Sequence, residues 1–383
     1  MKKILALILA GLLTLCVASC GNKADEENND GSTAVEQNYV EEAAKKGKFE
    51  YARNLDGDYE IIKYESYSID ASDITLPSDI DGFDIVGIAD EAFKAENSIK
   101  SVTIPATYEY IGEYAFYDCD SLTTVNLSSS ISKIGKGAFE SCDVLSDIKL
   151  PASLKNIDEY TFRDCKALVS LDLSSVVSIQ KGAFLNCSAL KTLTVSDKIE
   201  YATKEAFYGC DSLEYTKADG LLYLGNSKNE TVLLVSPEDL NVIECTVSDT
   251  TKVIADAAFN NCDSLITIIL SDSVKVINGT SFVGCTELSY NTSENDKNGL
   301  YLGTKDNPCK VLINVEITTV EDFKLNKDTK IIADTAFANC TKLKDIGFDG
   351  TEAEWNKIAK AENWNGDLTV NIACSDKTIT VLG

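Results

Sequence analysis

The sequence lacks histidine altogether, and its 383 residues include only one methionine, two tryptophans and five prolines. The absence of histidine excludes Ser-His-Asp and Cys-His catalysis, histidine-ligated zinc and a histidine pH switch. Carboxylate, lysine and Asp/Glu-metal chemistry stay compatible with the composition. Basic residues are scarce as well, with 35 Lys and Arg against 61 Asp and Glu. A net charge of −26 repels phosphate backbones, so we expect no nucleic-acid partner.

The N-terminus carries the features of an export signal. Lys2 and Lys3 precede an apolar run over residues 4–17, and the small residues Ala18 and Ser19 precede Cys20. The basic start, the apolar run and the small residues before the expected cleavage site together predict a secretory signal peptide over 1–19. The run is shorter than the ~20 apolar residues of a membrane-spanning helix.

The ending "VASC" resembles the bacterial lipobox, which implies that Cys20 is lipidated and becomes the first residue of the mature protein. Two or more acyl chains give lasting membrane attachment. We therefore expect an extracytoplasmic protein, lipid-anchored to the bacterial cell membrane and surface-exposed. The alternative is an ordinary signal peptide cleaved elsewhere. Residues 20–47 are polar and acidic, and we interpret them as a disordered tether.

The rest of the chain repeats a short pattern. "AFYDCDSLTTVNL" returns as "AFESCDVLSDIKL", "TFRDCKALVSLDL", "AFLNCSALKTLTV" and "AFNNCDSLITIIL". Its phenylalanines are 22 or 23 residues apart, except for two gaps of 52 and 55 residues. A fixed period of this length indicates a solenoid, in which each coil buries its apolar face only against its neighbours. The repeated phenylalanines are Phe93, Phe116, Phe139, Phe162, Phe184, Phe207, Phe259, Phe282 and Phe337.

Each coil is predicted to contain one short strand. In the second coil Val125 and Leu127 alternate with Thr124 and Asn126, which predicts an inward and an outward row. A small residue precedes each phenylalanine and lets neighbouring coils approach closely. An isoleucine usually stands five residues before it, but Ala202 takes that place in one coil. The long gaps hold two β runs around a polar turn, which predicts hairpin insertions near 215–240 and 290–318.

These features resemble the BspA-like leucine-rich repeat family of bacterial surface proteins. The matching motifs are the "IGKGAFESCDVLSDIKL" type of coil, the "GLLYLG" hairpins, the opening "FEYARNLDGDYEIIKYES" and the tail "FDGTEAEWNKI". The resemblance covers roughly 48–383 and implies an α/β-type repeat solenoid with ~23-residue coils, a parallel strand ladder and inserted β-hairpins. We expect an N-terminal cap with a hairpin at 48–92, repeats at 93–348 and a C-terminal cap at 349–383. In that cap, Trp355 and Trp364 are expected to lie on a helix that covers the last coil.

Cysteine is plentiful, but its positions favour packing over chemistry. Eleven cysteines remain after Cys16 and Cys20, an odd number that cannot pair fully. No C-x₂-C pair supports zinc or iron–sulfur binding, and no base is present for a catalytic thiol. We interpret them as buried free thiols, with some disulfides as the alternative. The predicted core ladder joins Phe116, Phe139, Phe162, Phe184, Phe207, Phe259, Phe282 and Phe337 with Cys119, Cys142, Cys165, Cys187, Cys210, Cys262, Cys285 and Cys340.

The outward strand positions are the candidate binding face, because exposed strands are the usual binding surface of such solenoids. They are Thr124, Asn126, Asp147, Lys149, Ser170, Asp172, Thr192 and Thr194. Clustered tyrosines around 108–117 and 201–223 are interpreted as edge packing, with sugar or protein binding as the alternative. The acidic turns do not fit a calcium loop, so we expect no metal and no cofactor.

The family resemblance implies a non-enzymatic module that binds a protein or glycan ligand and adheres to host or neighbouring-cell components. Its only predicted contact with a membrane is the lipid anchor. One alternative is an envelope scaffold for a partner protein of the same cell. The other is a carboxylate-based glycan hydrolase, for which no paired acids stand out.

Thiol titration tests the packing interpretation of the cysteines. The denatured chain without residues 1–20 should show most of its eleven thiols free, because inward-pointing side chains on parallel coils do not face one another. Labelling under denaturing, non-reducing conditions and mass spectrometry count them. Fewer than half free would show that disulfides hold the coils together.

Overall fold

The computed structural model describes residues 44–46, 48–65, 72–226, 228, 230–294, 296–316, 319–360, 364–366 and 368–382. The predicted signal peptide, Cys20 and nearly all of the predicted tether lie outside these residues. The tether boundary at residue 47 is wrong, because Ala44–Lys46 form a strand that pairs antiparallel with residues 49–51. All of the described residues belong to one compact unit, Glu41–Gly383.

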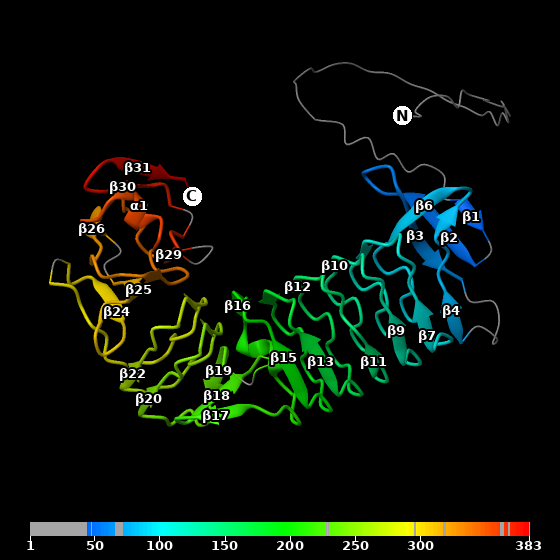
Figure 1. The fold of residues 1–383 in the computed structure, drawn as a ribbon, viewed down its shortest axis with the longest axis horizontal. Coiled ribbons are helices and arrows are strands. Elements are labelled where there is room, and N and C mark those ends of the chain that lie inside the picture. The colour runs from blue at the N-terminus through cyan, green and yellow to red at the C-terminus, as the bar shows by residue number, and fades with distance from the viewer. Residues whose placement is uncertain are drawn as a thin grey trace, which may run out of the picture. The chain divides into compact units, whose positions relative to one another are not determined.

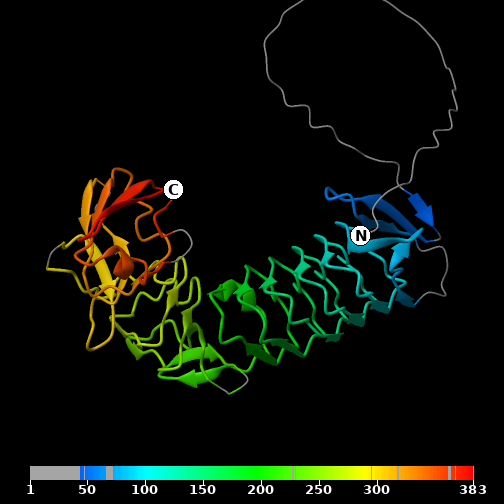
Figure 2. The ribbon, with the colours of Figure 1, turned by 45° about the horizontal axis from the view of Figure 1, so that its top comes forward.

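Most coils contribute a strand to a first row, which is the row expected from the alternating pattern. Its members pair in parallel in four sheets, β4-β7-β9-β11, β13-β15, β20-β22 and β26-β28-β30. In Figures 1 and 2 these strands follow one another along one side of the stack. The row consists of β4 (Asp73–Thr75), β7 (Ser101–Thr103), β9 (Thr124–Asn126), β11 (Asp147–Ile148), β13 (Ser170–Leu173), β15 (Thr192–Val195), β20 (Glu244–Thr246), β22 (Thr267–Ile269), β26 (Asp322–Lys324), β28 (Asp345–Gly347) and β30 (Val370–Ala373).

A second row of strands, not expected from the sequence, contains the repeated isoleucine position. It pairs in parallel as β6-β8-β10, β12-β14-β16, β19-β21-β23 and β25-β27-β29. Most members have two residues, too few for an alternating pattern. The row consists of β6 (Phe83–Ile88), β8 (Tyr110–Ile111), β10 (Lys133–Ile134), β12 (Asn156–Ile157), β14 (Ser178–Ile179), β16 (Tyr201–Ala202), β19 (Leu233–Pro237), β21 (Val253–Ile254), β23 (Val276–Ile277), β25 (Val311–Val315), β27 (Ile331–Ile332) and β29 (Ala359–Lys360).

The remaining strands belong to the ends and the insertions. Near the N-terminus are β1 (Ala44–Lys46), β2 (Phe49–Arg53), β3 (Tyr59–Tyr64) and β5 (Asp79–Ile80). Strands β2 and β3 form the antiparallel hairpin expected there, and β3 continues in parallel onto β6. The insertions contain β17 (Thr216–Ala218), β18 (Leu221–Leu224) and β24 (Gly299–Leu302), and the chain ends with β31 (Thr378–Val381) antiparallel to β30.

Both insertions are hairpins, and each supplies a strand to the second row. Strand β18 pairs antiparallel with β19, and β24 with β25. Leu234 of β19 stands in register with Ile254, as Leu312 of β25 does with Ile332. The second strand of each hairpin therefore occupies the place of a missing isoleucine strand and starts the ladder of the coils that follow it.

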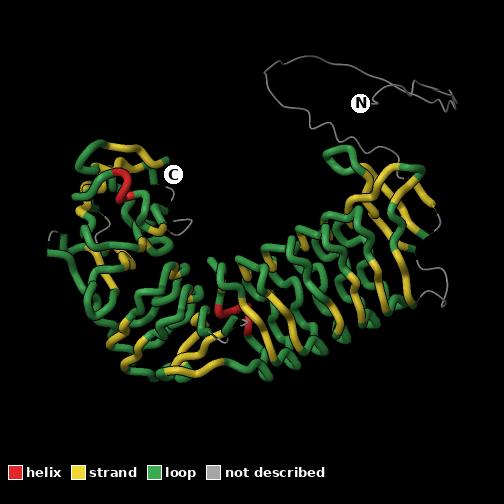
Figure 3. The backbone as a smooth tube through the Cα atoms, in the orientation of Figure 1, coloured by secondary structure: helices red, strands yellow, loops and turns green. Residues whose placement is uncertain are grey.

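Helix is almost absent from the described residues, so the α/β-type part of the predicted class is not confirmed. They contain one α-helix, α1 (Glu352–Trp355), and one 3₁₀-helix, η1 (Lys204–Phe207), drawn red in Figure 3. A Thr351–Glu354 capping box starts α1. The expected helix through Trp364 is wrong, because Ala359 and Lys360 already pair with β27 as β29. Trp355 and Trp364 are nevertheless buried against each other and the last coil.

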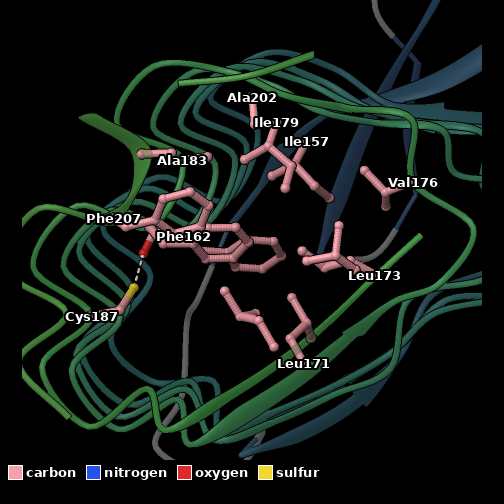
Figure 4. Packing of buried hydrophobic residues seen from close by; sticks show 14 of the residues in the cluster. Ile157, Phe162, Leu171, Leu173, Val176, Ile179, Ala183, Cys187, Ala202 and Phe207 are labelled. Atoms are coloured by element: carbon pink, nitrogen blue, oxygen red, sulfur yellow. Dashed lines mark hydrogen bonds between the residues drawn. The ribbon is translucent and has the colours of Figure 1, made fainter. Parts of the chain in front are cut away.

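The core of each coil is closed from three sides. Figure 4 shows Leu171 and Leu173 from the first row, Ile157 and Ile179 from the second, and phenylalanine rings from the turns between the rows. From Phe93 to Phe207 the rings of successive coils stack with centroids 4.8–6.2 Å apart and planes within 18° of parallel. The stack breaks at the first insertion, resumes for Phe259 and Phe282, and gives way to edge contacts near Phe337.

Backbone hydrogen bonds explain the small residue before each phenylalanine. The Phe116 amide donates to the carbonyl of Ala138 at 2.8 Å, and the Phe139 amide to that of Thr161 at 2.9 Å. The same bond recurs from Phe162 to Ala183. Within each uninterrupted run of coils, a phenylalanine is thus bonded to the residue preceding the next one, and a bulky side chain there would separate the coils.

The repeated cysteine is a hydrogen-bond donor as well as a packing residue. Cys165 Sγ donates to the Phe139 carbonyl at 3.2 Å, and Cys187 Sγ to the Phe162 carbonyl at 2.9 Å, the dashed line in Figure 4. The thiol therefore ties the turn of one coil to the turn of the previous coil. The same contact is made by Cys119, Cys142, Cys210 and Cys285.

Substitution of Cys165 separates these two roles. Cys165→Ala removes both volume and donor and should cost about 2 kcal/mol of unfolding free energy. Cys165→Ser keeps a donor and should cost about 1 kcal/mol less than the alanine variant. Chemical denaturation of both variants measures the difference. If serine is the more destabilising of the two, the thiol acts only as a small apolar group.

Candidate binding surfaces

The predicted binding residues lie on the outer side of the first strand row, and we call them the strand face: Thr124, Asn126, Asp147, Lys149, Ser170, Asp172, Thr192 and Thr194. Register places Thr124 beside Asp147, while Ser170 and Asp172 lie beside Thr192 and Thr194. The structure thus brings the residues together in two groups, on β9–β11 and on β13–β15. Thr124 and Thr194 are half-buried and the other six are exposed.

The strand face is polar because the alternate residues of the same strands fill the core. Val125, Ile148 and Leu171 are each at most 5% exposed. Few contacts hold the outward side chains, although Asn126 Nδ2 donates to Thr103 Oγ1 at 3.3 Å. This surface offers hydrogen-bond donors and acceptors at the spacing of neighbouring strands, without a large aromatic anchor. Such an arrangement suits an extended contact made of many small interactions.

The residues of the predicted core ladder do not reach this surface. All eight phenylalanines and all eight cysteines are at most 7% exposed, and the eleven cysteines in the described residues are free. Burial raises the pKa of Cys210 and Cys245 to about 12, and it holds that of Cys187 well above its ordinary value. These thiols stay protonated at neutral pH, and protonated thiols are poor nucleophiles and poor metal ligands.

A second surface, which sequence reasoning missed, lies over the turns that carry the phenylalanines. It is a groove of about 420 Å³, which we call the tyrosine groove: Tyr114, Tyr117, Tyr160, Lys94, Lys136 and Arg163. Tyr114 and Tyr117 belong to the tyrosine cluster at 108–117, for which the sequence predicts edge packing, with sugar or protein binding as the alternative. Tyr160 and the cations stand 19 or more residues from those tyrosines, so stacking of the coils is needed to bring them together.

Two of these tyrosines occupy an unusual backbone position. Tyr114 and Tyr160 stand two residues before a phenylalanine with φ of 53° and 57°, in the left-handed region. The coils that follow them have Gly137 and Gly182 at this position, also with positive φ. A β-carbon on either glycine would lie 2.4 Å from Cε1 of the tyrosine in the preceding coil. Each ring therefore rests against the bare backbone of a glycine.

Ion pairs fix the cations beside the rings. Lys94 Nζ lies 2.8 Å from Glu91 and 5.5 Å from the Tyr117 ring centroid. Lys136 Nζ lies 2.7 Å from a carboxylate oxygen of Glu159, which raises the pKa of the lysine, and 5.5 Å from the Tyr160 ring centroid.

Arg163, which belongs to the same coil as Tyr160, also lies over the Tyr160 ring. Its Cζ is 5.6 Å from the Tyr160 ring centroid, and Nη1 is 3.3 Å from a Glu140 carboxylate oxygen. Burial raises the pKa of Glu140 above its ordinary value, although the positive charge of Arg163 partly opposes this shift. Both signs of charge therefore line the groove.

Neither surface resembles a metal centre. In the part of the chain that the structure describes, no three Cys, Asp or Glu residues are placed to hold a metal ion. The same residues include no helix that could cross a lipid bilayer.

Comparison with known proteins identifies the repeats. The family model described as "BspA type Leucine rich repeat region" matches in six copies, at residues 86–214, 238–301 and 315–360. No curated protein matches the chain. Solved structures show similarity to a leucine-rich repeat protein of T. pallidum, with 25% identity over 63% of this chain and 88% of that one, and a TM-score of 0.39.

A leucine-rich cell surface protein of Faecalibacterium prausnitzii is 22% identical over 83% of this chain and 97% of its own, with a TM-score of 0.40. The pneumococcal vaccine antigen PcpA is 17% identical over 80% and 82%, with a TM-score of 0.36.

The fit between tyrosine and glycine predicts a coupled effect on stability. Gly182→Ala should cost about 2–4 kcal/mol, because it adds a clash with Tyr160 to the ~1–2 kcal/mol of a left-handed alanine. Gly57→Ala is the control, since Gly57 also has a positive φ, of 86°, but nothing within 4 Å of the added carbon. Gly57→Ala should lose only the free energy of placing alanine in the left-handed region, and chemical denaturation measures the unfolding free energies of both variants.

The excess cost of Gly182→Ala should disappear when Tyr160→Ala is already present. A double-mutant cycle measures this coupling. Additive effects of the two substitutions would show that the ring does not rest on the glycine.

Proposed function

This chain belongs to the BspA-type leucine-rich repeat family, and on that premise we propose that it is a non-enzymatic interaction module of a bacterial cell surface, adhering through the strand face to protein or glycan components of a host or neighbouring cell. Cys20 carries the lipid anchor, and the tether ends before Ala44, where strand β1 begins. Membership in the family supports the interaction role, and the signal-like N-terminus supports export.

The observation that carries the proposal is the register of the first strand row. Because coils pair without offset, Ser101, Thr124 and Asp147 form one continuous line of outward polar side chains. Ser170 and Thr192 form a second such line. Side chains of this size lose little rotamer entropy on binding, so many weak hydrogen bonds can add up over an extended partner.

A binding panel tests the proposal. The chain of residues 21–383 is applied at physiological salt to immobilised matrix proteins, mucins and glycans. Saturable binding to at least one of them is expected. Replacing Thr124, Asn126, Asp147 and Lys149 together by alanine should weaken it about tenfold or more, equivalent to ~1.4 kcal/mol.

The matched control replaces four polar residues near the second row, Glu109, Ser132, Lys133 and Asn156, which are also exposed. This variant should bind like the parent protein. If nothing on the panel binds, adhesion is wrong and a partner from the producer's own envelope becomes the next target. Equal losses in both variants would show that the strand face is not the site.

A further inference from the structure

The tyrosine groove has features that the packing of the fold does not explain. Its hydroxyl groups, on Tyr114, Tyr117 and Tyr160, make no hydrogen bond to any other described residue, and all three side chains are only partly buried. Two buried tyrosines differ, since the Tyr108 hydroxyl donates to the Pro77 carbonyl and that of Tyr223 accepts from the Ser248 amide. The groove tyrosines thus keep free polar groups and ring surface at the same place.

The position of the rings is fixed before any ligand arrives. Tyr114 and Tyr160 rest on Gly137 and Gly182, and the Tyr114 ring meets Tyr117 at 78° with centroids 5.9 Å apart. Lys136 and Arg163 approach the Tyr160 ring from two coils. Rings and charges held in this way lose little freedom on binding, which favours affinity.

The charges in the groove indicate what it binds. Three cations and the two carboxylates of Glu91 and Glu140 line it together, and the cations are already ion-paired. A strongly anionic ligand would meet these carboxylates and a chain of net charge −26, whereas a cationic ligand would meet the three cations. A neutral ligand with many hydroxyl groups can accept from lysine and arginine and donate to glutamate.

Size and aromatic content agree with such a ligand. About 420 Å³ falls within the ~300–1,000 Å³ range of small-ligand sites. The C–H groups on one face of a pyranose ring carry partial positive charge and pack on the negative face of an aromatic ring. Three rings with flanking hydrogen-bonding groups therefore suit a short run of sugar units.

We propose that the tyrosine groove is a binding site for neutral oligosaccharides, with Tyr114, Tyr117 and Tyr160 as the stacking surface and Lys94, Lys136, Arg163 and Glu140 as hydrogen-bonding partners. It shares no residue with the strand face. It therefore stands or falls independently of the function proposed above.

Titration of the chain of residues 21–383 with short oligosaccharides tests the site. The probes are neutral tetrasaccharides of glucose, mannose, xylose and N-acetylglucosamine, together with anionic tetragalacturonate and a heparin tetrasaccharide. Ligand-observed NMR detects binding, and calorimetry measures Kd. At least one neutral probe should bind saturably, with an affinity that changes little between low and physiological salt.

Variants then locate the binding. Tyr114→Ala and Tyr160→Ala should each raise Kd about tenfold or more, as expected for loss of a stacking ring. Tyr160→Phe keeps the ring and should stay within about threefold of the parent, so it controls for loss of folding. Tyr208→Ala removes a tyrosine that is 47% exposed on another coil and should change nothing. The strand-face variant should also bind the sugar normally.

Three results would overturn the proposal. The first is no binding of any neutral probe. The second is binding that the tyrosine variants leave unchanged while they remain folded by thermal unfolding. The third is binding confined to the anionic probes and lost at physiological salt, which would assign the groove to charge attraction instead.

Discussion

The stacking of each phenylalanine turn on the next is the constraint on which the fold depends. One coil has two short strands and a turn, too little to enclose an aromatic ring. Ring contact, an amide-to-carbonyl bond and in most coils a thiol-to-carbonyl bond join neighbouring turns at one place, as between Phe139 and Phe162. All three act only between adjacent coils, so stability grows along the chain by nearest-neighbour terms. A coil without a neighbour has no core.

The hairpin insertions show which part of this arrangement can be interrupted. At the first insertion the second row starts a new sheet, in which β19 pairs with β21, and the ring stack stops at Phe207 and restarts at Phe259. At the second hairpin the apolar core itself divides into two clusters. Each insertion therefore interrupts the strand ladder as well as the ring stack, and the coils beyond it pair with the second strand of the hairpin, β19 or β25.

Much of the fold could be predicted from the sequence because its signal is periodic. The 23-residue spacing located the phenylalanines, the first strand row and both insertions. The second row escaped prediction because two residues such as Lys133 and Ile134 carry no alternation. The helix expected through Trp364 failed because pairing of Ala359 with the ladder outweighed local helix preference. The donor role of Cys165 could not be read either, since its acceptor, the Phe139 carbonyl, is a backbone atom of another coil. For the same reason only the Tyr114–Tyr117 pair of the tyrosine groove stood out in the sequence, because Tyr160 and the cations of other coils join it only through stacking.

The seating of Tyr114 on Gly137, and of Tyr160 on Gly182, limits how this surface can vary. A tyrosine at that position requires a glycine at the same position of the next coil, so two adjacent coils cannot both carry one. Aromatic rings of this kind can therefore be placed at most on every second coil, about 10 Å apart at ordinary strand spacing. A substitution that adds such a tyrosine must therefore be accompanied by a glycine at the same position of the next coil. New aromatic surface on such a solenoid would thus be gained in paired substitutions about one repeat apart. The packing of neighbouring coils, and not the shape of the ligand, then limits how many aromatic rings the surface can present.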